Sequence, residues 1–159
     1  MGIEIERKFL VAGDGWRQQA ASQTRFSQGY LSRDPARTVR VRVAGERAFL
    51  TIKGATTGAT RAEFEYEVPV ADAQQLLALA DGPVVEKIRH LCAIGGMTWE
   101  VDEFLGANAG LVLAEIELQS EAQAFTRPGW LGAEVTGDAR YVNANLAVQP
   151  FGSWPAAPR

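Results

Sequence analysis

The chain has 159 residues, of which 47% are hydrophobic, and this is enough for one compact domain with its own core. Its formal net charge of -3 and its pI near 5.2 argue against a general binder of nucleic-acid duplexes or membrane surfaces. The single histidine excludes metal sites that need two or more histidines, and the single cysteine excludes an internal disulfide framework.

The sequence favours a cytoplasmic location. No apolar run reaches the length of about 18 residues that a membrane-spanning helix needs. The N-terminus enters a strand pattern at once, without the basic and then apolar segment of a signal peptide. A lone cysteine, Cys92, fits a reducing compartment.

The first predicted element is a strand over residues 2–11, in which apolar and charged residues alternate. Glu4, Glu6 and Lys8 share one parity, while Ile3, Ile5 and Phe9 share the other. Because successive side chains of a strand point to opposite faces, one face of this strand is apolar and the other is charged.

Alternation of this kind recurs along the chain and predicts seven more strands, at residues 24–32, 38–44, 47–54, 61–68, 84–94, 97–105 and 111–119. Eight antiparallel strands close into a small barrel without open edges. The predicted fold is therefore an α+β fold built on an eight-stranded antiparallel barrel.

Helices are predicted in the remaining segments, at residues 14–22, 71–81, from the capping-box pattern Ser120–Gln123 to Pro128, and at about 138–147. They supply apolar surface that can cover the outside of the barrel. No linker or repeat divides the chain, so residues 1–147 are predicted as one domain and residues 148–159 as a tail.

The charged parities of the strands collect on one face of the predicted barrel. Its basic members are Lys8, Arg40, Arg42, Lys53, Arg61, Lys87 and Arg89. Its acidic members are Glu4, Glu6, Glu63, Glu65, Glu67, Glu100, Asp102, Glu115 and Glu117. If the apolar face packs under helices, the charged face must line the inside. Burying ions without compensation is costly, which indicates a water-filled tunnel with ligands of its own.

The lysines are informative because the chain otherwise uses arginine. There are 13 arginines and only three lysines, and Lys8, Lys53 and Lys87 all fall at the charged parity of predicted strands. The lysine ammonium is a compact point charge, whereas the arginine guanidinium is a planar fork of donors. The three lysine positions are therefore where a compact positive charge is expected to be needed.

Both halves of the charged face indicate ligands. Converging arginines and lysines suit the oxygens of a compact polyanion such as a polyphosphate. Carboxylates without histidine or cysteine nearby suit a hard divalent cation, Mg²⁺ or Mn²⁺. Pairs spaced two apart, Glu4 with Glu6 and Glu115 with Glu117, place adjacent carboxylates on one face. A polyphosphate bridged to a metal uses both sets, although simple charge balance is the alternative for the acidic set.

At these residues the chain resembles a known family. Glu4-Ile5-Glu6-Arg7-Lys8 matches the ExExK signature of the CYTH domain superfamily, the triphosphate tunnel metalloenzymes. Further blocks stand in the family's order, including Arg40-Val41-Arg42, Thr51-Ile52-Lys53, Glu86-Lys87-Ile88-Arg89 and Glu115-Ile116-Glu117. The resemblance covers nearly all of the first 147 residues, and is greatest to small single-domain bacterial members that resemble inorganic tripolyphosphatases.

The resemblance implies an eight-stranded tunnel with a charged lumen, a C-terminal plug helix and metal-dependent hydrolysis of a linear triphosphate. The residues expected to bind substrate are Lys8, Tyr30, Arg40, Arg42, Lys53, Arg61, Lys87, Arg89 and Arg140. The expected metal ligands are Glu4, Glu6, Glu115 and Glu117. Catalytic roles are expected for Lys8 and, as second ligands or water-orienting groups, for Glu63, Glu65 and Asp102.

Several alternatives remain open at this level. Within the family, a class IV type adenylate cyclase or a thiamine triphosphatase would use the same tunnel. A non-catalytic polyphosphate or nucleotide-binding module needs the basic set but not the acidic one. A lipocalin-like carrier predicts an apolar lumen, which the parity contradicts. The sequence leaves the oligomeric state undecided between a monomer and a homodimer.

Overall fold

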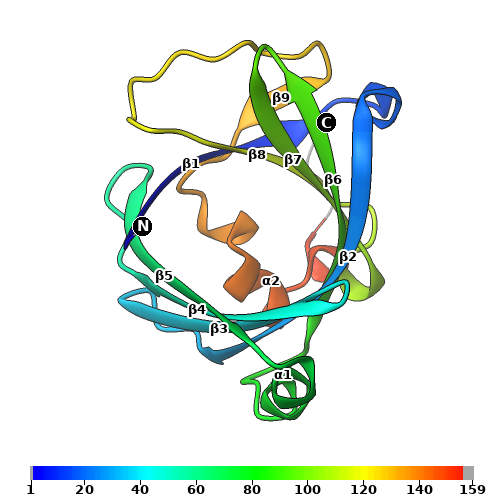
Figure 1. Cartoon of the computed structure of the whole chain (residues 1–159). Helices are drawn as coiled ribbons and strands as arrows, with labels where there is room; N and C mark the ends of the chain where they lie inside the picture. Colours follow the sequence, from blue (N-terminus) through cyan, green and yellow to red (C-terminus); the bar gives the residue numbers. More distant parts are fainter. Residues whose placement is uncertain (1, 156–159) are drawn as a thin grey trace.

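The computed structural model describes residues 2–155, which form a closed antiparallel β-barrel (Figure 1). Within these residues the strands are β1 (Gly2–Val11), β2 (Ala20–Ser32), β3 (Arg37–Ala44), β4 (Arg47–Gly54), β5 (Thr60–Val68), β6 (Val85–Ile94), β7 (Met97–Phe104), β8 (Val112–Glu117) and β9 (Leu131–Glu134). The strand order is β5-β4-β3-β2-β6-β7-β8-β1, and an additional β1–β5 pairing closes the ring. The prediction of an eight-stranded antiparallel barrel is confirmed.

Strand β1 closes the barrel because its two halves pair with different neighbours. Its first half, from Gly2 to Ile5, pairs with β5. Its second half, from Glu6 to Leu10, pairs with β8. Metal and phosphate candidates on β1 therefore lie at the seam where the first and last strands of the barrel meet.

The ninth strand, β9, was not predicted. It lies beside the end of β1, where Phe9 pairs with Glu134 and Val11 with Leu131. With only four residues, it is too short for alternation to reveal it. It extends the wall without entering the ring of eight.

The helical segments in the described residues are the helices α1 (Val70–Leu77) and α2 (Asn143–Val148) and the 3-10 turns η1 (Gly15–Gln18), η2 (Gly106–Asn108), η3 (Ala139–Tyr141) and η4 (Phe151–Ser153). Helix α1 begins after Pro69 and buries Ala73 against Val41 and Ala48 of the neighbouring strands. None of these helices is long and apolar enough to cross a membrane.

Two helix predictions are wrong. Residues 14–22 form only the turn η1 before β2 begins at Ala20, which pairs with Cys92 of β6. The capping-box segment after Ser120 forms turns and irregular chain. There the Glu121 carboxylate accepts hydrogen bonds from Ala59 N and Thr60 Oγ1, at 3.3 and 2.7 Å, and therefore ties this loop to β5 instead of opening a helix.

The apolar core has an outer part on the barrel wall and an inner part in which strands pack against α2 inside the ring. The outer cluster packs Phe9, Trp99 and Ile116 of the barrel wall under Trp16 and Trp130 from the covering segments. A turn and an irregular loop thus provide cover that the sequence assigned to helices. The outward parity faces this cover, and the inward parity carries the charged residues together with apolar residues, such as Leu113, that pack on α2.

The predicted C-terminal helix over 138–147 is interrupted. Turn η3 ends at Tyr141, and α2 then starts at Asn143 and runs to Val148. In Figure 1, which looks along the barrel, α2 lies inside the ring of strands. Trp154 of the predicted tail packs its ring on Tyr141 at 5.2 Å between centroids. The boundary at residue 147 stays a prediction, and Met1 and the tail residues 156–159 lie outside the described residues.

Candidate active site

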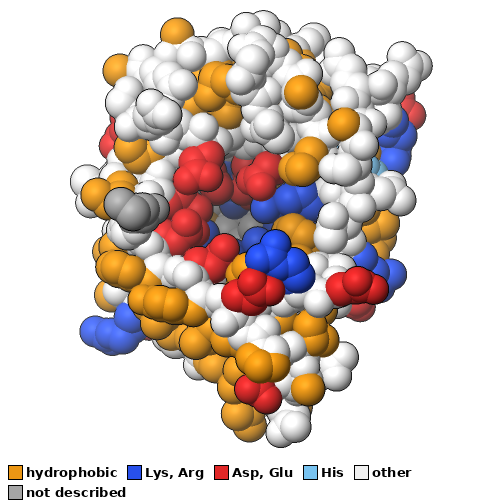
Figure 2. Space-filling view, viewed as in Figure 1, with side chains coloured by type: hydrophobic (Ala, Val, Ile, Leu, Met, Phe, Trp, Pro, Cys, Tyr) orange, Lys and Arg blue, Asp and Glu red, His pale blue; other side chains and the backbone are white. Residues whose placement is uncertain are grey.

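The interior of the barrel is a charged cavity of about 530 Å³. Looking into it, Figure 2 shows acidic side chains around the opening and basic side chains within. Residues of α2 and of the segment before it, among them Val142 and Asn143, also line the cavity. The cavity is thus a tunnel with one end occupied by α2, as the resemblance implied.

Seven basic side chains converge on this cavity from five strands, and we call them the basic clamp: Lys8, Arg40, Arg42, Lys53, Arg61, Lys87 and Arg89. All seven had been predicted from strand parity. Arg40 Nε is buried and has no hydrogen-bond partner among the described residues. Buried donors of this kind are costly unless a ligand accepts from them, so the clamp is suited to an anion with many oxygens.

One end of the clamp is held by a buried carboxylate. Asp102 Oδ2 accepts from Lys87 Nζ at 2.6 Å, and its two oxygens accept from Arg89 Nε and Nη2 at 2.8 and 2.9 Å. Asp102 and Lys87 are both fully buried. Burial alone would raise the pKa of Asp102, but Arg89 and Lys87 lower it to about 2. Burial lowers the pKa of Lys87 to about 7 although Asp102 opposes this shift.

The opposite side of the clamp is held by Glu4. Its carboxylate accepts from Lys53 Nζ at 3.2 Å and from Arg61 Nε at 3.1 Å. Burial alone would raise the pKa of Glu4, but Lys53 and Arg61 help to lower it to about 2. Glu4 therefore stays ionised and shares its one negative charge between two cations of the clamp.

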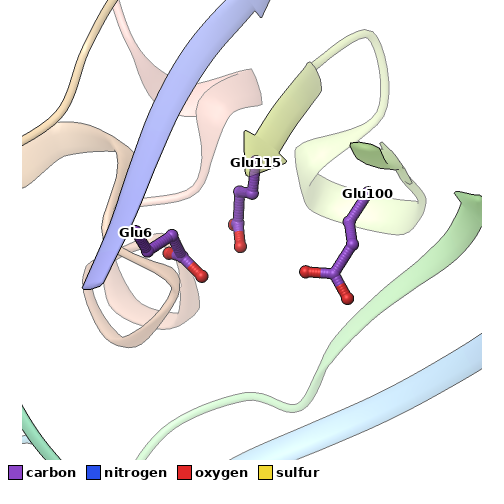
Figure 3. A group of neighbouring side chains, drawn as sticks. All are labelled: Glu6, Glu100 and Glu115. Carbon is purple, nitrogen blue, oxygen red and sulfur yellow. The ribbon is translucent and has the colours of Figure 1, made fainter. Parts of the chain in front are cut away.

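Three carboxylates from three strands meet beside the clamp, as Figure 3 shows for Glu6, Glu100 and Glu115. One oxygen from each lies within 4.8 Å of the others. The strand register explains the meeting, because Glu100 of β7 stands directly opposite Glu115 of β8. We call these residues the acidic trio.

The charges of the acidic trio are unequally compensated. Burial, followed by the carboxylates of Glu115 and Glu4, raises the pKa of Glu6 well above its usual range. Burial also raises the pKa of Glu100, against the opposing effect of Arg89. Glu115 behaves differently: burial alone would raise its pKa, but Lys8 and Arg89 hold it well below the usual range.

The acidic trio fits a hard divalent cation by its chemistry. All three donors are carboxylate oxygens, and the raised pKa of Glu6 reports a shortage of positive charge at this point. A cation held by oxygen supplies that charge, and Mg²⁺ and Mn²⁺ prefer such donors. Of the four ligands predicted from the sequence, Glu6 and Glu115 belong to the trio, whereas Glu4 is occupied by Lys53 and Arg61.

The remaining predicted site residues that line the cavity differ in their partners and in their exposure. Glu63, Glu65, Glu117 and Tyr30 all line the cavity. Glu63 lies 3.3 Å from Lys53 Nζ, and Glu65 accepts from Thr51 Oγ1 at 2.9 Å. Glu117 is exposed and stands opposite Glu6 across the β1–β8 pair, next to the trio.

Two predicted residues do not line the cavity. Arg140 is exposed and is bound to Asp138, with Nη2 and Oδ2 at 2.8 Å. Asp102 is enclosed behind Lys87 and Arg89, and this geometry favours an anchoring role over a catalytic one. For Asp102, strand parity gives the face of the residue but not what its side chain meets there; Arg140 was expected from the family resemblance and not from parity.

Three residues of the site were not assigned a role from the sequence. Glu100 was placed on the charged face, but its meeting with Glu115 depends on cross-strand register. Gln28 is fully buried and accepts from Arg42 Nε at 2.8 Å. Asn143 lines the cavity from α2 and accepts from Lys87 Nζ at 3.1 Å. No signal within a single segment marks the two amides as part of a basic site.

Comparisons with known proteins agree with this fold. The CYTH domain model matches residues 2–146. An inorganic triphosphatase of Acetivibrio thermocellus is 50% identical over 152 residues, covering 95% of this chain and 97% of that protein. An inorganic triphosphatase of Nitrosomonas europaea is 40% identical over 150 residues, with coverages of 91% and 97%. A crystal structure of an inorganic triphosphatase has a TM-score of 0.64 at 38% identity, covering 91% of this chain and 94% of that one.

Proposed function

The chain belongs to the CYTH domain family, and we propose that it is an inorganic triphosphatase that hydrolyses a linear triphosphate inside its tunnel with the help of a divalent metal. The observation that carries this proposal is the placement of the basic clamp and the acidic trio on one cavity. An anion-binding surface alone would suffice for storage or transport. Carboxylates beside the clamp add a metal site, which hydrolysis of a phosphoanhydride needs.

The clamp binds and orients the substrate in this mechanism. Lysine and arginine donors hold the phosphate oxygens and neutralise negative charge as it moves onto the leaving phosphate group. Arg40 and Arg42 contribute from β3, Lys53 from β4, and Lys87 and Arg89 from β6. Because these strands are fixed in a closed barrel, the donors are in place before the reaction begins.

The acidic residues have two tasks. Glu6, Glu100 and Glu115 would hold the divalent metal, with Glu117 next to them, and the metal when bound polarises a phosphate oxygen. Oxygen ligands make Mg²⁺ or Mn²⁺ the proposed ions. Glu63 and Glu65, which line the cavity without belonging to the trio, are proposed to orient the attacking water. The one histidine, His90, contacts Glu103 and Trp16 and does not line the cavity, which favours direct attack of water over a histidine-activated nucleophile.

A substrate panel tests this function. Phosphate release from tripolyphosphate, ATP, pyrophosphate and thiamine triphosphate should be measured with Mg²⁺, Mn²⁺, Ca²⁺ or EDTA, together with cyclic AMP formation. We expect metal-dependent release that is fastest with tripolyphosphate. Cyclic AMP from ATP would instead support the cyclase, and faster turnover of thiamine triphosphate would support the thiamine triphosphatase. Tight binding of a triphosphate without any turnover would support the non-catalytic binding module.

We also propose that the chain forms a homodimer through an apolar face on the outside of β1, β4 and β5. Its side chains are exposed and uncharged: Ile3 by 62%, Ile52 by 38%, Phe64 by 47% and Tyr66 by 57%. Register places Ile52 directly beside Phe64. These neighbouring apolar side chains would form the centre of an interface of about 800 Å² per partner.

Sedimentation analysis checks the dimer. The wild-type chain should sediment as a dimer at micromolar concentration, and Phe64→Arg should sediment as a monomer because it places a charge at the centre of the apolar face. The control is Leu79→Arg, since Leu79 is 71% exposed on another part of the surface. A monomeric wild-type chain, or equal behaviour of the two variants, would refute the proposed interface.

A further inference from the structure

We propose that Asn143, the first residue of α2, is a positioning residue that holds two arms of the basic clamp in place for the substrate. This inference rests on the proposed function and deepens it, because it assigns a task to the helix that occupies the end of the tunnel. Asn143 itself need not touch the substrate. It acts through its side-chain oxygen, which accepts from Lys87 Nζ at 3.1 Å and from Gln28 Nε2 at 3.2 Å.

The first arm runs through Lys87. Its ammonium has three protons, and two of them are directed to Asp102 Oδ2 and Asn143 Oδ1. Lys87 is fully buried yet lines the cavity. Two fixed acceptors on a tetrahedral ammonium determine the direction of the third proton, which remains for a phosphate oxygen. Without Asn143, Asp102 alone would allow the ammonium to rotate about a single hydrogen bond.

The second arm runs through Gln28 to Arg42. The Gln28 amide nitrogen donates to Asn143 and to Tyr30 Oη, the latter at 3.0 Å, and its oxygen accepts from Arg42 Nε at 2.8 Å. A reversed amide would turn its NH₂ group toward the guanidinium of Arg42. The acceptor on Asn143 therefore fixes the orientation of Gln28 that Arg42 requires.

Arg42 depends on this contact more than the other arginines of the clamp do. Within residues 2–155 it has no carboxylate at ion-pair distance, and Gln28 is its only side-chain hydrogen-bond partner. Burial, with the neighbouring Arg40 and Arg89, lowers the pKa of Arg42 to about 9. With Nε held by Gln28, the terminal nitrogens of the guanidinium remain for the polyanion.

The same end of the tunnel contacts a third clamp residue. Lys8 Nζ donates to the backbone oxygen of Tyr141 at 3.0 Å, two residues before Asn143. The segment from Tyr141 to Asn143 thus meets Lys8 from β1, Gln28 from β2 and Lys87 from β6. Only the Asn143 contacts depend on the identity of a side chain in this segment, so Asn143 is the position at which mutation can separate the plug from the clamp.

Asn143→Ala tests the inference by binding and by kinetics. Isothermal titration of tripolyphosphate in EDTA should show a dissociation constant raised about tenfold, because one hydrogen bond to a charged group is lost and the clamp is less well ordered. In the metal-loaded assay the KM for tripolyphosphate should rise by about the same factor, with kcat changed less than about threefold. An unchanged dissociation constant would overturn the inference.

Asn108→Ala is the matched control. Asn108 is also buried against α2, where it donates to Leu146 O at 3.4 Å and accepts from Phe151 N at 2.8 Å, but it lies outside the tunnel. We expect this variant to lower the melting temperature while leaving the KM and the dissociation constant for tripolyphosphate unchanged. If both variants raise the dissociation constant equally, α2 has only a structural role and the inference fails.

A double-mutant cycle with Gln28→Ala examines the second arm. Because Asn143 and Gln28 act on Arg42 along one path, the effect of Asn143→Ala on tripolyphosphate binding should be smaller in the Gln28→Ala background than in the wild type. Full additivity would refute the Gln28 arm. If the wild-type chain hydrolyses no triphosphate, the proposed function is wrong. The binding measurements in EDTA do not depend on turnover, so they still decide the role of Asn143.

Discussion

Replacing Glu115 by glutamine should lower metal-dependent hydrolysis of tripolyphosphate by about 10³-fold or more. The substitution keeps the shape of the side chain but removes a charge from the centre of the acidic trio, where Glu115 meets Glu6 and Glu100. Stabilisation of charge by a bound metal amounts to several kcal/mol, and each 1.4 kcal/mol corresponds to about a tenfold change in rate. The measurement is kcat/KM with saturating Mg²⁺ or Mn²⁺.

The binding of tripolyphosphate without metal separates this effect from misfolding. Glu115 lies 3.7 Å from Lys8 Nζ and 3.8 Å from Arg89 Nη2. Loss of its charge frees these cations for phosphate, so tripolyphosphate should bind Glu115→Gln in EDTA at least as tightly as the wild type. The control is Glu103→Gln, because Glu103 pairs with Arg17 outside the cavity. Near-normal turnover by Glu115→Gln would remove Glu115 from the metal site.

The second large effect is expected on stability, from Asp102→Ala. The mutation removes the carboxylate that holds both the fully buried Lys87 and the partly buried Arg89. Breaking a buried ion pair by removing one partner costs about 3–5 kcal/mol, because an uncompensated charge remains. The free energy of unfolding, measured in urea, should fall by about this amount with an unchanged m-value.

Two comparisons sharpen the test of Asp102. Asp102→Asn keeps one acceptor oxygen and should lose less stability than Asp102→Ala. Glu67→Ala, which breaks a solvent-exposed pair with Arg47, should leave the unfolding midpoint unchanged. Tripolyphosphate should recover part of the loss in Asp102→Ala, since the polyanion compensates the two freed cations. A loss below about 1 kcal/mol for Asp102→Ala would show that Asp102 is not the anchor of the clamp.

Strand parity predicted most of the barrel and the clamp because it is a local property. Within one strand, Glu4, Glu6 and Lys8 share a face whatever the remainder of the chain does. Repeated over eight segments, the same rule placed Lys53 and Lys87 in the lumen, where the structure has them. Fold class and charge of the tunnel could therefore be predicted without tertiary information.

Features that depend on two segments could not be predicted in this way. Glu100 joins the acidic trio because the β7–β8 register sets it opposite Glu115. Asn143 reaches Lys87 across 56 positions of sequence. The helix predicted after Ser120 failed for the same reason: Glu121 bonds to Thr60, and Phe125 packs on Phe9 at 6.0 Å between ring centroids. Tertiary contacts outweighed a local capping pattern there.

The most direct test of the account is a crystal structure of the wild-type chain with Mn²⁺ and a non-hydrolysable triphosphate analogue, with anomalous scattering used to locate the metal. We expect an anomalous peak coordinated by oxygens of Glu6, Glu100 and Glu115, and a triphosphate whose oxygens contact the basic clamp. An empty tunnel, or a manganese ion bound away from the acidic trio, would contradict the proposal that metal and triphosphate meet inside the barrel.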